Sequence, residues 1–137
     1  MNIFPIEAGN FKLDGGAMFG VVPKSLWRQS NPPDNDNLIE MSSRCLLIEN
    51  SDRLTLVDTG MGNKQSDKFF SHYKRWGDFE LTKSINEAGF SIDEVTDVFL
   101  THLHFDHCGG ASYISSKSGQ NEVLFKNAYY WSNQKHW

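Results

Sequence analysis

Three histidines and one aspartate stand within six residues of this chain. The run from Thr101 to Gly110 reads Thr-His-Leu-His-Phe-Asp-His-Cys-Gly-Gly, so the four side chains follow the spacing HxHxDH. Imidazole nitrogens with an occasional carboxylate are typical ligands of zinc and related transition metals. The concentration of such ligands on one short segment predicts a metal site, and metal-dependent hydrolysis is the chemistry we expect there.

The spacing suggests two metal ions. His102 and His104 lie two residues apart, so on an extended chain their side chains project to the same side and can converge on one ion. Asp106 and His107 are adjacent, and they can reach a common ion only if the chain turns there. The two glycines that follow would permit such a turn. Zinc is the expected metal, with iron, manganese or cobalt as permitted substitutes.

A short strand is expected to position the ligands. Residues 95–101 are rich in β-branched and aromatic side chains, which predicts a largely buried strand with the ligands at its C-terminal end. Residues 91–94 have the form of a capping box, which predicts one helical turn before that strand. The turn, the strand and the ligand loop thus form one unit.

The rest of the chain is expected to alternate between hairpins and helices. Two hairpins are predicted near the N-terminus, from residues 2–6 and 9–13 and from residues 43–49 and 53–57 around a three-residue turn. Helices are predicted at residues 67–76, where aromatic residues recur at helical spacing and are expected to pack in the core, and at residues 80–88. Closing strands are predicted at residues 122–125 and 128–131.

The ligand run carries a family resemblance. Thr-His-Leu-His-Phe-Asp-His-Cys-Gly-Gly resembles the signature of the metallo-β-lactamase fold superfamily. Residues 54–60, Leu-Thr-Leu-Val-Asp-Thr-Gly, are similar to the strand of that family that ends in Asp-Thr-Gly before the metal loop. Residues 11–23 resemble the N-terminal hairpin of members grouped with N-acyl-homoserine lactonases and organophosphate hydrolases. The resemblance therefore covers nearly the whole chain, in order.

The resemblance implies roles for the matching residues. His102 and His104 would bind the first metal, and Asp106 and His107 the second. Asp58 would be a carboxylate behind the ligands that orients their loop; the alternative is an ordinary Asp-Thr-Gly turn after a strand. Asp106 would also be the catalytic residue, since it would lie close enough to the nucleophile to orient a hydroxide or carry a proton to the leaving group.

The implied fold is α+β, namely half of an αββα sandwich in which one mostly antiparallel or mixed sheet carries two or three helices. A complete sandwich needs about 200–250 residues. Residues 1–137 are therefore interpreted as a single partial domain, the N-terminal half of a metallo-β-lactamase-like domain. The family completes its site with two further histidines and a bridging aspartate, and the chain has no counterpart of these after His107.

Half a sandwich would leave the inner face of its sheet exposed. The other half is therefore expected from a complementing C-terminal half or from a second copy of the chain in a homo-oligomer. The expected function of the complete site is hydrolysis of a small-molecule lactone, ester or phosphotriester. A thioesterase of the glyoxalase II type, a non-catalytic metal-binding fragment or subunit, and an interaction module without metal remain as alternatives.

Composition narrows the class of protein. The chain has 39% hydrophobic and 22% charged residues and a formal net charge of -4, which gives no sign of a nucleic-acid binder. No apolar run approaches the roughly 20 residues that span a bilayer, so no membrane partner is expected. Cys45 and Cys108 are too few for a disulfide framework and are expected to be reduced thiols in the cytoplasm. We assign no ligand role to Cys108 or His72.

Overall fold

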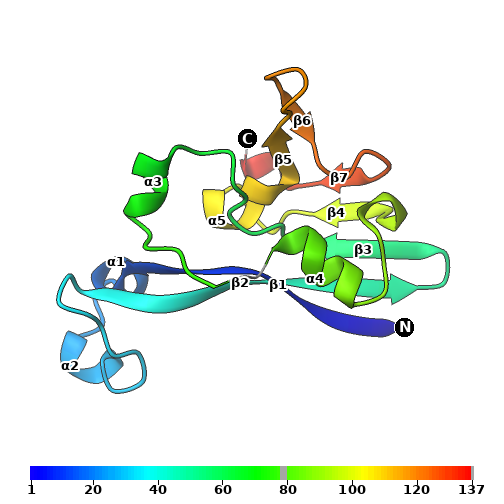
Figure 1. Ribbon diagram of the computed structural model, residues 1–137. Coiled ribbons are helices and arrows are strands. Elements are labelled where there is room, and N and C mark those ends of the chain that lie inside the picture. Colours follow the sequence, from blue (N-terminus) through cyan, green and yellow to red (C-terminus); the bar gives the residue numbers. More distant parts are fainter. Residues whose placement is uncertain (78–79, 137) are drawn as a thin grey trace.

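The computed structural model describes residues 1–77 and 80–136, and its centre is a five-stranded mixed sheet (Figure 1). The strand order is β1-β2-β3-β4-β7. The strands are β1 (Asn2–Asp14), β2 (Leu38–Asn50), β3 (Arg53–Val57), β4 (Asp97–Phe99) and β7 (Tyr129–Trp131). The first three strands pair antiparallel, whereas β4 pairs parallel with β3 and with β7. The predicted α+β class and mixed sheet are confirmed.

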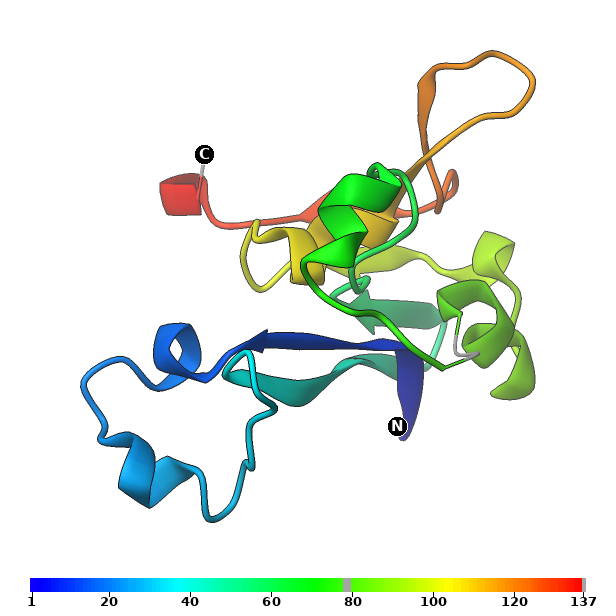
Figure 2. The same ribbon diagram turned by 60° about the vertical axis from the view of Figure 1, so that its left-hand side comes forward.

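Short helices surround the sheet. They are α1 (Gly15–Phe19), α2 (Lys24–Trp27), α3 (Asp67–Ser71), α4 (Leu81–Glu87) and α5 (Phe105–Cys108), with 3-10 turns at Ile92–Glu94, Gly109–Ala111 and Gln134–His136. The segment that connects β1 to β2 contains α1 and α2 and extends away from the sheet (Figure 2). A separate hairpin of β5 (Ser112–Ile114) and β6 (Asn121–Val123) projects near β7. In the described part of the chain, no helix is long and apolar enough to cross a membrane.

The predicted N-terminal hairpin is wrong, because residues 2–14 form one long strand. β1 pairs with β2 along almost its whole length, and the register shifts only between Glu7 and Asn10. Gly9 lies in this interval with φ of 113°, a conformation that favours glycine. The break expected between residues 6 and 9 is therefore a β-bulge, which bends the strand and continues it.

The predicted helix at residues 67–76 is shorter than expected. α3 ends at Ser71, and the chain then returns to the sheet, where Lys12 N donates to Tyr73 O at 2.6 Å and Trp76 N donates to Asn10 O at 3.1 Å. Pairing with β1 thus replaces the last turns of the helix. The core packing expected for its aromatic residues is confirmed for Phe70, which is buried, and for Phe69 and Tyr73, which pack in the same cluster. It is wrong for Trp76, which is 39% exposed.

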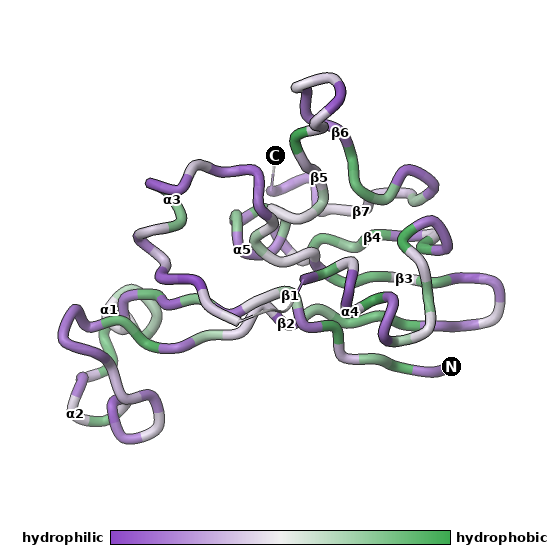
Figure 3. Tube along the Cα trace, in the orientation of Figure 1, coloured by the Kyte–Doolittle hydropathy of each residue, from purple (hydrophilic) through white to green (hydrophobic). Residues whose placement is uncertain are grey.

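The remaining expected elements are present with shifted ends. β2 and β3 form the second hairpin around a two-residue turn, because Asn50 pairs with Arg53. The helix expected at residues 80–88 is α4, and the capping box at residues 91–94 is confirmed. β4 covers only three of the seven residues expected for its strand, and the closing strands are β6 and β7. Figure 3 shows hydrophobic strands and hydrophilic turns in this arrangement.

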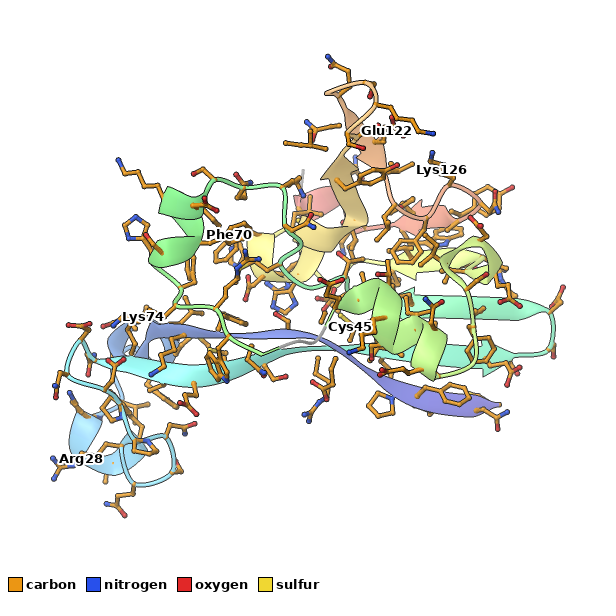
Figure 4. All side chains as sticks on the ribbon, in the orientation of Figure 1. Arg28, Cys45, Phe70, Lys74, Glu122 and Lys126 are labelled. Carbon is orange, nitrogen blue, oxygen red and sulfur yellow. The ribbon has the colours of Figure 1, made fainter. Side chains whose placement is uncertain are left out.

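One face of the sheet is buried and the other is open. Alternate side chains of the strands, including Leu47, Leu56 and Val98, are fully buried beneath α4, whose Ile85 is also fully buried. Cys45 lies in the same core under α4 (Figure 4). On the opposite face the paired residues Phe99 and Trp131 remain 47% and 50% exposed, and Tyr129 and Ile3 are more exposed still.

A buried carboxylate joins three strands at this open face. The Asp97 side chain is only 4% exposed and accepts hydrogen bonds from Arg53 Nε at 2.9 Å and Nη2 at 2.6 Å. Trp131 Nε1 and Thr96 Oγ1 each donate to the same carboxylate at 2.7 Å. Hydrogen bonding from Arg53 holds the pKa of Asp97 below its ordinary value, and Thr96 and Trp131 act in the same direction. Asp97 thus ties β3, β4 and β7 together.

Asp97→Asn should lower the free energy of unfolding at pH 7 by about 1–3 kcal/mol, because a buried, charge-assisted hydrogen-bond network loses its charge. A lowered folded-state pKa contributes stability that is present above the unfolded pKa of about 3.9 and is lost as the pH falls. The difference in the free energy of unfolding between Asp97→Asn and the wild type, measured by urea titration, should therefore become smaller below about pH 4. The matched control is Asp52→Asn at the exposed β2–β3 turn, which should change stability little. Equal losses in the two variants would contradict this role of Asp97.

Candidate metal centre

The four predicted ligands follow β4 and lie in the short segment that leads into and through α5. The imidazole rings of His102 and His104 have centroids 4.7 Å apart, and those of His102 and His107 are 4.0 Å apart. The fold therefore gathers the three rings of the motif at one place, although β4 supplies fewer residues than expected. His72 caps the end of α3 and is exposed.

Asp106 and His107 lie side by side at α5. The turn predicted between them is supplied by α5, and Asp106 Oδ2 lies 3.6 Å from His107 Nε2. Two donors bound to a tetrahedral zinc at about 2.1 Å lie about 3.4 Å from each other. The observed separation therefore fits two ligands of a common ion. Among the described residues, no three His, Cys, Asp or Glu side chains are already arranged as a metal-binding group.

The Asp58 carboxylate lies directly behind this segment. Its Oδ1 accepts from Thr101 N at 2.9 Å, and its Oδ2 lies 2.8 Å from His107 Nδ1. Because an ionised carboxylate can only accept, His107 carries its proton on Nδ1 and leaves Nε2 free to bind a metal. Asp58 itself has a positive φ of 60°, a strained conformation that is typical of functional sites. Its orienting contact is present in the structure, and its effect on a bound metal stays a prediction.

Close backbone packing explains the two glycines after the ligands. A Cβ on Gly109 would lie 2.1 Å from Met61 O, and a Cβ on Gly110 would lie 2.1 Å from Thr59 O. Thr59 N donates to His107 O at 2.7 Å, which pulls the ligand segment onto the loop after β3. Gly109 has ordinary helical φ and ψ angles of -59° and -38°. The glycines are therefore required for close approach, and the reason expected from the sequence, freedom to turn, is wrong for Gly109.

Burial shapes the charge states around the ligands. It lowers the pKa of His102, and the neighbouring His107 and His104 lower it further. A lower pKa favours the neutral imidazole, which is the form that binds metal. The thiol of Cys108 is half-buried and has a raised pKa, again mainly because of burial, so it stays protonated. Lys64, whose Nζ donates to Gly109 O, has a pKa lowered by burial.

An aromatic cluster flanks the ligands on one side. Phe105, which stands between two predicted ligands in the sequence, has its ring 5.3 Å from Phe69 and 4.6 Å from Tyr73, centroid to centroid. Phe70 supports this cluster from α3 (Figure 4) and packs with the buried side chains of Phe11 and Met61. The candidate centre therefore has an apolar flank of partly buried aromatic side chains.

Two residues of the site, Thr101 and Lys64, have no counterpart in the sequence reasoning. Thr101 donates its backbone N–H and its hydroxyl to Asp58, and Lys64 donates to a carbonyl of the glycine pair. The position of Thr101 immediately before the first histidine is a signal that could have identified it. Lys64 follows the Asp-Thr-Gly segment by several residues, and no spacing rule connects it to Gly109.

The chain is similar in sequence to a known protein family and to several named proteins. The sequence model of the Metallo-beta-lactamase superfamily matches residues 38–137. The N-acyl homoserine lactonase AiiB of Agrobacterium fabrum is 25% identical over 120 residues, which cover 81% of this chain and 43% of that protein. A 70-residue match, 31% identical, links the chain to the transcription termination factor FttA of Methanocaldococcus jannaschii, and it covers 51% of this chain and 9% of that protein.

Solved structures show the same fold. A probable metal-dependent hydrolase from Staphylococcus aureus superposes with a TM-score of 0.90 at 30% identity, over 99% of this chain and 48% of that one. AidC, a dizinc quorum-quenching lactonase, superposes with a TM-score of 0.66 at 27% identity, over 98% of this chain and 42% of that one. The chain thus spans about half the length of these relatives. Since the family model covers well over half of its residues, the chain belongs to the metallo-β-lactamase superfamily.

Proposed function

We propose that this chain supplies one half of the active site of a metal-dependent hydrolase that uses two divalent ions, most simply zinc. The observation that carries the proposal is the placement of Asp106 and His107 at 3.6 Å from each other, with His107 Nε2 left free by its contact to Asp58. The family membership of the chain and the dizinc lactonase among its structural relatives support the same proposal.

Each residue of the chain has a distinct task in this proposal. His102 and His104 would hold one ion, and Asp106 and His107 the other, while Asp58 orients His107. When bound, the ions supply Lewis acidity and an activated water. The carboxylate of Asp106 would orient the nucleophile and carry a proton to the leaving group, and the apolar flank around Phe105 would keep bulk water away. The ligands that the family adds to these four would come from a complementing half of the fold.

The proposed substrate is a lactone, an ester or a phosphotriester. AiiB and AidC are named as lactonases, and AidC was solved with the product of an N-acyl homoserine lactone. The aromatic cluster beside the ligands suits a substrate with an apolar portion, since aromatic side chains bury large apolar areas. Glyoxalase II-type thioesters are the alternative substrate class for the same metal chemistry.

A second candidate is a non-catalytic metal-binding fragment or subunit. It is favoured by the fact that the described residues contain no ready group of three metal-binding side chains. In this case the chain would bind metal through its two pairs of ligands without turning over substrate. Both candidates bind metal, but only the hydrolase turns over substrate.

His104→Ala should reduce the zinc content of the purified protein and abolish turnover of the complete enzyme, because one of the two ligands of the first ion is lost. The matched control is His72→Ala, which removes an exposed imidazole from α3 and should leave the zinc content unchanged. Zinc is measured by elemental analysis after dialysis against metal-free buffer. Undiminished zinc in His104→Ala would refute the assignment of this ligand.

A panel of substrates separates the proposed activities. Hydrolysis of an N-acyl homoserine lactone, a phosphotriester and a glutathione thioester is measured at equal concentrations, with and without added zinc, in the protein combined with its complementing half. We expect zinc-dependent lactone hydrolysis to be fastest, in line with the named relatives. Thioester hydrolysis above the other two would favour the alternative substrate class, and zinc binding without any turnover would favour the non-catalytic candidate.

A further inference from the structure

The hydroxyl of Thr101 links the Asp58 carboxylate to the His102 ring. Thr101 Oγ1 is 2.9 Å from both carboxylate oxygens of Asp58 and 3.1 Å from His102 Nδ1. Asp58 Oδ2 is in turn 2.8 Å from His107 Nδ1. A continuous series of hydrogen bonds therefore runs from His102, the predicted ligand of one ion, through Thr101 and Asp58 to His107, the predicted ligand of the other.

The protons of this series can be assigned from the groups themselves. The Asp58 carboxylate only accepts, so the single hydroxyl proton of Thr101 is donated to it. The oxygen of Thr101 then has lone pairs left and accepts from His102 Nδ1–H. Both His102 and His107 thereby carry their proton on Nδ1 and leave Nε2 free. Histidines that bind metal usually donate their other ring N–H to a fixed acceptor in this way.

We propose that Thr101 is a positioning residue that couples the two metal sites. Its hydroxyl fixes the tautomer and the ring orientation of His102, and through Asp58 it shares the group that orients His107. This inference rests on the proposed function, because it concerns the ring nitrogens that would face the metals. Loss of the hydroxyl should therefore weaken the binding of both ions, although Thr101 is not one of the predicted ligands.

The structure offers a clean way to remove only the hydroxyl. Thr101 is exposed, so a valine at this position opens no cavity, and its backbone N–H still donates to Asp58 Oδ1 at 2.9 Å. Thr101→Ser keeps the hydroxyl and should restore wild-type behaviour. The matched control is Thr55→Val, which makes the same change in β3, on the open face of the sheet and beside Asp97.

The first measurement uses the metal-free chain. Nitrogen-15 NMR of the imidazole rings at pH 8.5, about two units above the ordinary pKa of histidine, reports which ring nitrogen carries the proton. In the wild type and in Thr101→Ser we expect His102 to be protonated on Nδ1, and Thr101→Val should lose this preference. Thr55→Val should match the wild type. An unchanged His102 tautomer in Thr101→Val would overturn the proposed coupling.

The second measurement is a zinc titration of the protein combined with its complementing half, monitored by calorimetry. A parallel titration with cobalt is monitored by the visible spectrum. Thr101→Val should weaken both binding steps by about 10–100-fold, the range seen when groups that support metal ligands are removed. Weakening of one step alone would overturn the coupling. Failure of the wild-type protein to bind zinc when combined with its complementing half would overturn the proposed function and the coupling with it. An unchanged tautomer with normal zinc binding would overturn the coupling alone.

Discussion

The position of the ligand segment depends on the hydrogen bonds of the Asp58 carboxylate. It accepts from the backbone and the side chain of Thr101 and faces Nδ1 of His107, so it holds both ends of the ligand motif at once. Its own backbone is tied to the sheet, because Asp58 N donates to Phe99 O at 2.9 Å at the end of β4. The strained φ of this residue is offset by these bonds. A rigid sheet thereby determines where a short, otherwise irregular loop places its imidazoles.

The sequence predicted the ligand motif and its supporting carboxylate because both are encoded by residue types at fixed local spacing. HxHxDH needs no long-range information, and Asp-Thr-Gly after an apolar strand is similarly local. The α+β class was implied by the family resemblance, which rests on these same local motifs. Thr101 could have been included on these grounds, since it directly precedes His102, whereas the contact of Lys64 with Gly109 joins residues 45 positions apart.

The errors arise where distant segments override local preference. A turn was expected between residues 6 and 9, yet pairing with β2 on both sides of this interval keeps β1 extended and makes the irregularity a bulge. The aromatic residues after α3 have helical spacing, yet Tyr73 and Trp76 bond to β1 instead of continuing the helix. Gly109 is a further example, because a glycine is needed there only to make room for the carbonyl of Met61 across the loop. In each case a partner far along the sequence decides the local backbone.

The outer edge of the sheet at β7 affects how the chain should behave in concentrated solution. β7 is the last strand in the order, so its outer backbone groups have no neighbouring strand within the described sheet. Tyr129 and Trp131 project from it with 72% and 50% exposure, and Phe99 continues the apolar surface onto β4. An unprotected edge beside exposed aromatic side chains is a template for pairing with any other extended chain. Produced at high concentration without a cover for this edge, the chain should therefore self-associate and precipitate.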